Sequence, residues 1–238
     1  MQKSTIAALF ATTAIIAAAT TARADEMANI PVYGELKMGA SIDTADGIKN
    51  TSNVSGALAN VNQTSGTDTT GVFGAAVGLN LKKWGAPVRA EVEYAYRTDF
   101  NYNPNPNFVN AALPSKSTNS VTTQTLLVNG FYDFDTGTKF TPFVGAGIGA
   151  AFLNTSTKGT VISTGATENV SNSRTNFAWS VGAGVNYAID THWSADLAYR
   201  YLDLGSVDFG NTVTSASKGQ MTGDFTAHEV LAGLRYQF

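Results

Sequence analysis

The chain has 238 residues and a formal net charge of −3, and 14% of its residues are charged, against about 25% in a typical soluble domain. Apolar residues make up only 43%, and this combination is typical of strands that face lipid on one side and a polar interior on the other. The absence of cysteine excludes disulfides and thiolate chemistry, and the scattered basic residues give no case for nucleic acid as a partner.

The first 24 residues have the pattern of a secretory signal. Lys3 supplies a positive n-region, the stretch 6–21 is apolar, and Ala22-Arg23-Ala24 fits a small-x-small cleavage site. A membrane-spanning helix is the alternative, but the apolar run is shorter than the roughly 20 residues that a span needs, and Arg23 interrupts it. We therefore predict cleavage after Ala24 and a single barrel domain over residues 25–238.

From residue 25 onward, apolar side chains recur with a period of two, in segments of about 11–15 residues that suit tilted membrane strands. In one segment Trp193, Leu197 and Tyr199 fall on one face, and Asp196 and Arg200 fall on the other. Eight such segments are predicted as strands: 31–42, 70–82, 87–100, 120–134, 140–154, 174–189, 192–204 and 225–238.

A soluble β-sandwich also alternates, but two further patterns favour a membrane barrel. Long connectors rich in Ser, Thr, Asn and Gly alternate with short turns, as in bacterial barrels with long external loops and tight periplasmic turns. Aromatic residues gather at strand ends, as expected of two girdles at headgroup level. The long connectors are 43–69, 101–119, 155–173 and 205–224, and the short ones are 83–86, 135–139 and 190–191. The girdle residues include Tyr132, Phe134, Phe140, Phe152, Phe177, Tyr187, Trp193 and Tyr201.

The chain ends with Leu234, Tyr236 and Phe238 at alternate positions. A terminal Phe preceded by apolar residues in this way resembles the C-terminal strand signal that the barrel assembly machinery recognises. The fold class we predict is therefore all-β: an eight-stranded antiparallel up-and-down transmembrane barrel in the outer membrane. It must close, because an open sheet edge in hydrocarbon costs several kcal/mol for each unpaired backbone group.

The polar faces of the predicted strands place many charged residues inside this barrel. Buried charges are costly unless they are paired, so the near balance of cations and anions predicts a salt-bridge network that fills the interior and leaves no open pore. The predicted network consists of Glu35, Lys37, Arg89, Glu91, Glu93, Arg97, Asp133, Asp196, Arg200, Glu229 and Arg235. Glycines on the inward faces, at 145, 147, 149, 182 and 184, are expected to leave room for the long Arg and Glu side chains.

Catalytic motifs are weak. Asp135-Thr136-Gly137 matches the aspartic protease triplet, but it occurs once and lies where a turn is expected. His228 lacks the serine of the His-x-Ser pattern of lipid A deacylases, and His192 has that spacing but lies at a predicted periplasmic turn. We expect no catalytic residue, no metal site and no cofactor.

Three segments carry a family resemblance: Phe-Val-Gly-Ala-Gly-Ile-Gly at 143–149, Gly-Ala-Gly-Val-Asn-Tyr at 182–187, and Asp-Leu-Ala-Tyr-Arg-Tyr-Leu-Asp-Leu-Gly at 196–205. They resemble the small outer-membrane barrels of the opacity-protein and 25–31-kDa surface-antigen group, also called porin family proteins. The resemblance implies a surface antigen, an adhesin, an envelope-stabilising protein or, in some branches, a haem binder. The connector 43–69 contains neither His nor Tyr, which argues against haem.

The leading functional hypothesis is a non-enzymatic outer-membrane barrel that displays surface loops for adhesion or supports envelope integrity. A narrow porin for small polar solutes is the alternative, and a lipid A-modifying enzyme is a third possibility. The expected partners are outer-membrane lipid and lipopolysaccharide, the barrel assembly machinery, and a host or surface ligand of the loops.

Overall fold

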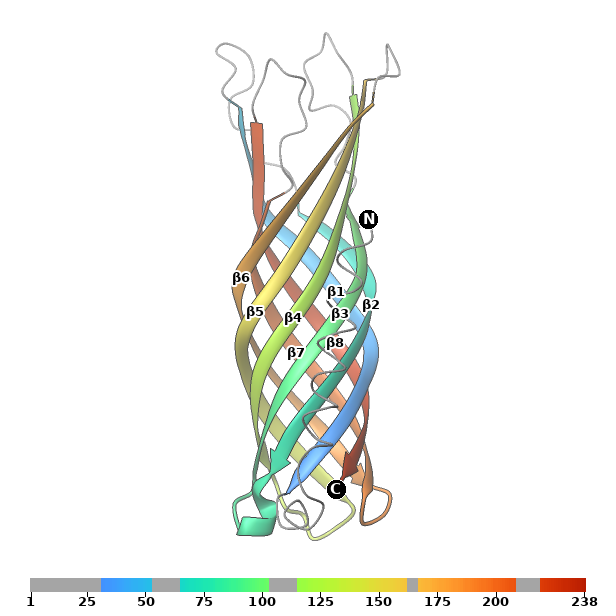
Figure 1. Cartoon of the computed structure of the whole chain (residues 1–238), viewed down its shortest axis with the longest axis vertical. Helices are drawn as coiled ribbons and strands as arrows, with labels where there is room; N and C mark the ends of the chain where they lie inside the picture. Colours follow the sequence, from blue (N-terminus) through green and yellow to red (C-terminus); the bar gives the residue numbers. More distant parts are fainter. Residues whose placement is uncertain (1–30, 53–64, 103–114, 162–166, 209–218) are drawn as a thin grey trace, which may run out of the picture.

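A computed structural model describes residues 31–52, 65–102, 115–161, 167–208 and 219–238. The predicted barrel is confirmed: eight antiparallel strands each pair with the next, and β1 pairs with β8 to close the cylinder (Figure 1). The strands are β1 (Val32–Ser52), β2 (Gly66–Asn80), β3 (Val88–Tyr102), β4 (Ser115–Asp133), β5 (Phe140–Val161), β6 (Thr167–Ala188), β7 (Trp193–Asp208) and β8 (Gly219–Gln237). The expected signal and its cleavage site lie outside the described residues. No helix in the described ranges is long and apolar enough to cross a membrane.

Short connections join the strands at one end, which we call the turn end. One of them differs from the prediction, because β2 stops at Asn80 and is followed by a 3₁₀ helix, η1 (Leu81–Trp84). The Asn80 side chain accepts a hydrogen bond from the Lys82 backbone N–H, 3.1 Å away, and begins this helix. Gly85 ends it with a left-handed φ of 82° that favours glycine.

The strands reach farther toward the opposite end, which we call the rim, than the alternation predicted. β1 continues to Ser52 instead of residue 42, and β6 begins at Thr167 instead of residue 174. Most of the predicted connector 155–173 is therefore paired strand, with the ladder between β5 and β6 running up to the pair Thr160 and Thr167. The boundaries at the turn end differ from the prediction by at most two residues.

The prediction failed at the rim because the hydrophobic pattern inverts along the strands. Nearer the turn end, apolar side chains such as Ile148 face outward (59% exposed) and charged ones face inward. Farther along β5, Asn154 and Ser156 are exposed on the outer wall while Leu153 is buried inside. Water replaces lipid as the outer solvent there, so the burial rule reverses. The polar side chains on the outer face of the strands at the rim have the composition of loops, so these segments were predicted as connectors.

Three β-bulges help to turn apolar side chains inward at the rim. Registers shift between Asp46 and Lys49, between Arg97 and Phe100, and between Asp203 and Ser206. A bulge adds one residue and thereby moves the following side chains to the other face. Strict alternation would place three apolar side chains outside, but the structure buries all three in the interior: Ile48, Phe100 and Val207.

These side chains join an apolar cluster inside the barrel, the rim core. Full burial of one Leu or Phe side chain stabilises by about 1.5–3 kcal/mol, so the cluster holds the strands together where lipid no longer surrounds them. Its members are Ala45, Ile48, Phe100, Val121, Leu127, Ala151, Leu153, Ala178, Leu202, Leu204, Val207, Phe225 and Ala227.

At the rim the cylinder divides into two sheets. The β2–β3 ladder ends at the pair Val72 and Arg97, and the β6–β7 ladder ends at the pair Trp179 and Asp203. Beyond these points β3, β4, β5 and β6 continue as one sheet, and β7, β8 and β1 continue together with β2 as the other. Figure 1 shows β4, β5 and β6 rising together, apart from β1 and β8. The rim is thus a small β-sandwich around the rim core.

Candidate functional site

All eleven residues of the predicted charge network lie inside the barrel. Ten of them are buried, and the side chain of Lys37 is 11% exposed. They come from five strands: Glu35 and Lys37 from β1; Arg89, Glu91, Glu93 and Arg97 from β3; Asp133 from β4; Asp196 and Arg200 from β7; Glu229 and Arg235 from β8.

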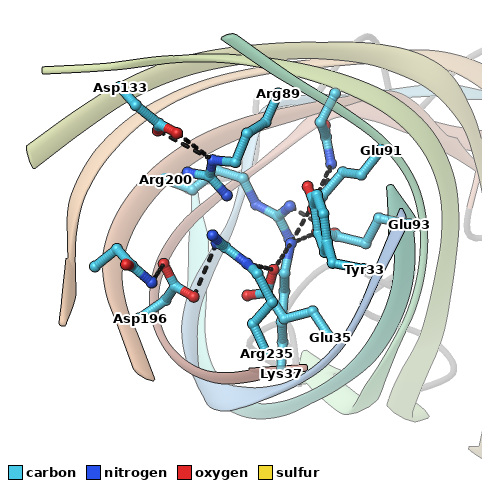
Figure 2. Close-up of polar contacts among 12 residues, drawn as sticks. Tyr33, Glu35, Lys37, Arg89, Glu91, Glu93, Asp133, Asp196, Arg200 and Arg235 are labelled. Atoms are coloured by element: carbon cyan, nitrogen blue, oxygen red, sulfur yellow. Dashed lines mark hydrogen bonds and ion pairs between the residues drawn. The ribbon is translucent and has the colours of Figure 1, made fainter. Parts of the chain in front are cut away.

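Ion pairs link nine of these residues into one continuous chain. Figure 2 shows the part of this chain that includes Lys37, Arg200 and Arg235. Arg200 is its centre, with Nη1 2.6 Å from Glu93 Oε1 and Nη2 2.6 Å from Glu229 Oε2. Glu229 also holds Arg97, whose Nε lies 2.6 Å from Glu229 Oε1. On the other side, Lys37 Nζ lies 2.7 Å from Glu93 Oε2. Two cations therefore share each of these buried glutamates.

The chain of ion pairs continues toward the turn end. Lys37 contacts Glu91 and, at 3.9 Å, Glu35. Arg235 then joins Glu35 Oε2 at 3.4 Å to Asp196 Oδ2 at 2.9 Å. Since β1, β3, β7 and β8 all contribute, the network ties together strands on both sides of the β1–β8 closure.

Arg89 and Asp133 form a separate pair between β3 and β4, with Arg89 Nε 2.8 Å from Asp133 Oδ2. The Arg89 guanidinium lies over two aromatic rings, 4.7 Å from the centroid of Phe131 and 4.9 Å from that of Phe143. Cation–π contacts of this kind are strengthened where water is excluded. Figure 2 shows this pair beside the main network.

Several neutral side chains also belong to the site, although the sequence pattern did not indicate them. Tyr33 Oη donates to Glu91 Oε2 at 2.9 Å, Asn129 Nδ2 donates to Glu91 Oε1 at 3.2 Å, and Asn186 Nδ2 donates to Asp196 Oδ1 at 3.1 Å. Their positions on inward faces would have identified them. Asp43 was assigned to a connector, but it lies inside β1 and accepts a hydrogen bond from Thr70 Oγ1 at 2.6 Å.

The space beside the network is small. A cavity of about 50 Å³ is lined by Arg89, Arg200 and Arg235, together with Phe131 and Phe143. A water molecule needs roughly 10–15 Å³ of such volume, so the cavity suits a few waters and no sugar or amino acid. Among the described residues no group of three or more His, Cys, Asp or Glu side chains is placed to hold a metal ion.

Three of the five inward glycines named from the sequence have a different role from the predicted one. A Cβ on Gly145 would collide with the Phe131 ring, one on Gly147 with the Asn129 amide, and one on Gly184 would come within 2.5 Å of Phe143 Cζ. At these three positions the room is taken by aromatic and amide neighbours. The bulky residues lie beside these glycines on adjacent strands, as in the pair of Phe131 and Gly145. A Cβ on Gly182 would lie 3.4 Å from Arg200 Cβ, as the prediction has it, and one on Gly149 would meet the Leu126 carbonyl oxygen.

Neither histidine sits in a catalytic arrangement within the described part of the chain. His228 is exposed on the outer wall, and its Nδ1 lies 2.6 Å from Tyr199 Oη. His192 is exposed at the turn end and stacks on Tyr236 with centroids 5.8 Å apart. Asp135 is likewise a turn residue, and its Oδ1 accepts a hydrogen bond from the Gly137 N–H.

Comparison with known proteins decides the family. A family model described as "Outer membrane protein beta-barrel domain" matches residues 7–238. The chain belongs to this family. It is accordingly an outer-membrane barrel, with an outward apolar wall in lipid. The resemblance to small outer-membrane barrels noted from the sequence is confirmed.

The relatives of this outer-membrane barrel include a named outer membrane protein and a putative adhesin. It is 31% identical over 215 residues to the outer membrane protein PagN of Salmonella typhimurium, covering 88% of this chain and 85% of PagN. It is 30% identical over 122 residues to the putative adhesin RC1281 of Rickettsia conorii, covering 50% of this chain and 49% of that protein. The crystal structure of OprG from Pseudomonas aeruginosa shares the fold, with a TM-score of 0.50, 14% identity and coverage of 88% and 96%.

Proposed function

We propose that this barrel is a non-enzymatic surface protein whose rim faces outward and makes adhesive contacts. One observation carries the proposal: the chain builds a β-sandwich beyond its lipid-facing wall, with a polar outer face and a packed rim core. A barrel that only spanned the membrane would not need strands that continue beyond its lipid-facing wall. The putative adhesins among its relatives support this function.

The orientation follows from the same asymmetry. In bacterial barrels the tight turns face the periplasm and the longer connections face outward, so the turn end, which also holds Phe238, is placed on the periplasmic side. Export by a signal cleaved after Ala24 belongs to this proposal. So does recognition of β8 by the barrel assembly machinery through Leu234, Tyr236 and Phe238. Leu234 and Phe238 are 46% and 55% exposed on the outer wall, where a recognition signal must be reachable.

A non-enzymatic role is supported by the contacts of the two histidines, which face Tyr199 and Tyr236 and no serine–carboxylate pair. The cavity beside the interior charges, about 50 Å³, is also too small for a substrate. Lipopolysaccharide is then a neighbour of the outward wall and its exposed aromatic residues, and not a substrate.

Cell adhesion tests the proposal. Gram-negative cells displaying the wild-type barrel should bind cultured epithelial cells more strongly than cells with an empty vector. Deleting residues 156–172 shortens the β5–β6 hairpin and should remove this gain, whereas deleting residues 136–138 at the turn end serves as the control and should keep it. Equal adhesion by the vector cells, or by the hairpin deletion displayed at the same level, would refute the proposal.

A different experiment tests the alternative function as a narrow porin. Ion pairs and the rim core fill the described interior in series, so purified protein in a planar bilayer should give no stable single-channel steps, and liposomes containing it should not swell in small sugars. Steady conductance steps from the folded wild type would favour the narrow pore instead.

A further inference from the structure

The β6 strand has a free edge at the rim. Its residues Thr167–Ala188 pair with β5 along nearly the whole strand, but its ladder with β7 begins only at Trp179. Within the described residues no strand pairs with the other edge of the segment 167–178. Figure 1 shows the upper part of β6 without a strand beside its outer edge.

The lower part of this edge is closed by side chains. β7 turns away at Gly205, which has a left-handed φ of 72°. There Asn176 Nδ2 donates to the carbonyl oxygens of Leu204 (2.8 Å) and Ser206 (2.7 Å), and Arg174 Nη1 donates to Ser206 Oγ at 2.8 Å. These contacts replace the missing ladder as far as Arg174. The open part of the edge is therefore 167–173.

Two hydrogen bonds indicate which backbone groups point to the open edge. The Ser173 N–H donates to the Asn172 side-chain Oδ1 at 3.0 Å, as expected where no strand supplies a carbonyl. The Asn172 carbonyl oxygen accepts from Thr155 Oγ1 of β5 at 3.2 Å, so it points the other way. Backbone groups alternate between the two edges of an antiparallel strand. Thr167, Asn169 and Ser171 thus share the free edge with Ser173.

Natural proteins usually protect a free edge with Lys, Pro or a covering element. The segment 167–173 contains neither Lys nor Pro, and Glu168 is its one charged residue. Asn169, Ser171 and Ser173 are exposed. It also lies beyond the lipid-facing wall, because polar side chains replace aromatic ones on the outer face of β6 above Phe177, which is 66% exposed. Within the described ranges no element therefore covers this edge, and it lies in water.

We propose that this edge binds an extended segment of a partner polypeptide as an added antiparallel or parallel strand. Donors and acceptors that repeat along every second residue match only another extended backbone, which is the basis of β-augmentation. The backbone of Thr167, Asn169 and Ser171 supplies the hydrogen bonds, and the small polar side chains leave room for the added strand. This inference rests on the proposed adhesive function and names the chemistry of its partner.

A proline substitution can test the free edge of β6 without preventing the barrel from folding. Pro is tolerated where the lost N–H faces outward from an edge strand, so Ser171→Pro should fold but lose strand addition, while Ser171→Ala keeps the backbone donor. The probe is a short synthetic peptide of alternating Thr and Val, measured against the full-length protein in lipid nanodiscs. A second peptide has its two central amides N-methylated, which blocks both of its edges.

We expect the unmodified peptide to bind the wild type and Ser171→Ala equally, and to bind Ser171→Pro at least about tenfold more weakly. The N-methylated peptide should lose binding to the wild type by a similar factor, and this comparison decides the matter even if Ser171→Pro does not fold. No binding by the unmodified peptide, or equal binding by the methylated peptide or by folded Ser171→Pro, would overturn the proposal. Adhesion of cells is scored separately, so the failure of the adhesive function is distinguishable from the failure of the edge.

Discussion

Phe100 of β3 and Phe225 of β8 meet edge to face inside the rim, with ring centroids 5.2 Å apart and an interplanar angle of 76°. Both rings are buried almost completely, with 1% and 0% exposure. They come from the two different sheets into which the cylinder divides. The contact joins these sheets beyond the last strand ladder between β2 and β3.

Phe225→Ala should therefore weaken the rim. Removing a buried Phe costs about 3–5 kcal/mol, through lost burial and the cavity that remains. The free energy of unfolding, measured by urea titration in detergent micelles, should fall by that amount. Phe177→Ala is the matched control, because its ring is 66% exposed, and it should cost less than half as much. Equal effects of the two variants would show that the rim core does not stabilise the barrel.

Glu229→Gln should destabilise the middle of the barrel. Glu229 is fully buried and neutralises both Arg97 and Arg200, and removing one member of a buried ion pair costs about 3–5 kcal/mol. Adding Arg97→Met removes the cation left without a carboxylate and should restore part of the loss, since Arg200 keeps Glu93. A double variant less stable than Glu229→Gln alone, in the same urea titration, would contradict this account.

An exposed ion pair provides the opposite expectation. Lys82 Nζ lies 3.1 Å from Asp135 Oδ2, but both side chains are more than half exposed, at 52% and 62%. Asp135→Asn should therefore leave the unfolding midpoint nearly unchanged, because solvent and salt screen such pairs. A loss as large as that of Glu229→Gln would mean that exposure is a poor guide to the value of charges in this barrel.

Gly145→Ala should impair folding because the added methyl group collides with the Phe131 ring. Overpacking of this kind costs about 1–3 kcal/mol, and the yield of folded barrel, seen as the heat-modifiable band on a gel, should fall. Phe131→Leu in the same chain makes room and should recover part of the yield. No recovery would point to the nearby Gly130 carbonyl oxygen as the obstacle, because it would lie 3.1 Å from the added methyl carbon.

The turn at Asp190 should make stability depend on pH in the acid range. Hydrogen bonds from the backbone N–H groups of Trp193 and His192 hold the pKa of the Asp190 carboxyl below its usual value. A carboxyl with a lowered folded pKa stabilises the fold above its unfolded pKa of about 4, and that contribution is lost as the pH falls through the folded pKa. Asp190→Asn should therefore flatten the fall in unfolding midpoint below about pH 4. An unchanged pH profile would contradict the prediction.

The lipid-facing half of this barrel is predictable from sequence, because one rule governs it. Alternation identified Arg97 and Glu229 as inward residues, but it did not pair them. They lie 132 residues apart, and their contact depends on the register of strands that meet only when the barrel closes. Tyr33 shares the inward face of Glu35 and was missed because an aromatic side chain was not expected among charges.

The rim was not predictable by the same rule. Ile48 and Phe100 follow bulges that change their face, and a bulge leaves no clear mark in a single sequence. The weak signal that two of these shifts do leave is a glycine within the strand pattern, at Gly47 and Gly205, which both have positive φ. Polar side chains on the outer face also resemble those of loops, although the paired backbone of β5 and β6 continues beneath them.

The reversal of side-chain polarity along β5 marks the level at which the surroundings of the barrel change from lipid to water. If the barrel moved toward the periplasm by one pair of residues, Asn154 would enter hydrocarbon. If it moved outward, Ile148 would come closer to water. Its height in the membrane is thus pinned by the same continuous strand that forms the rim. A partner bound at the rim is therefore held at a distance from the membrane that the continuous strands set.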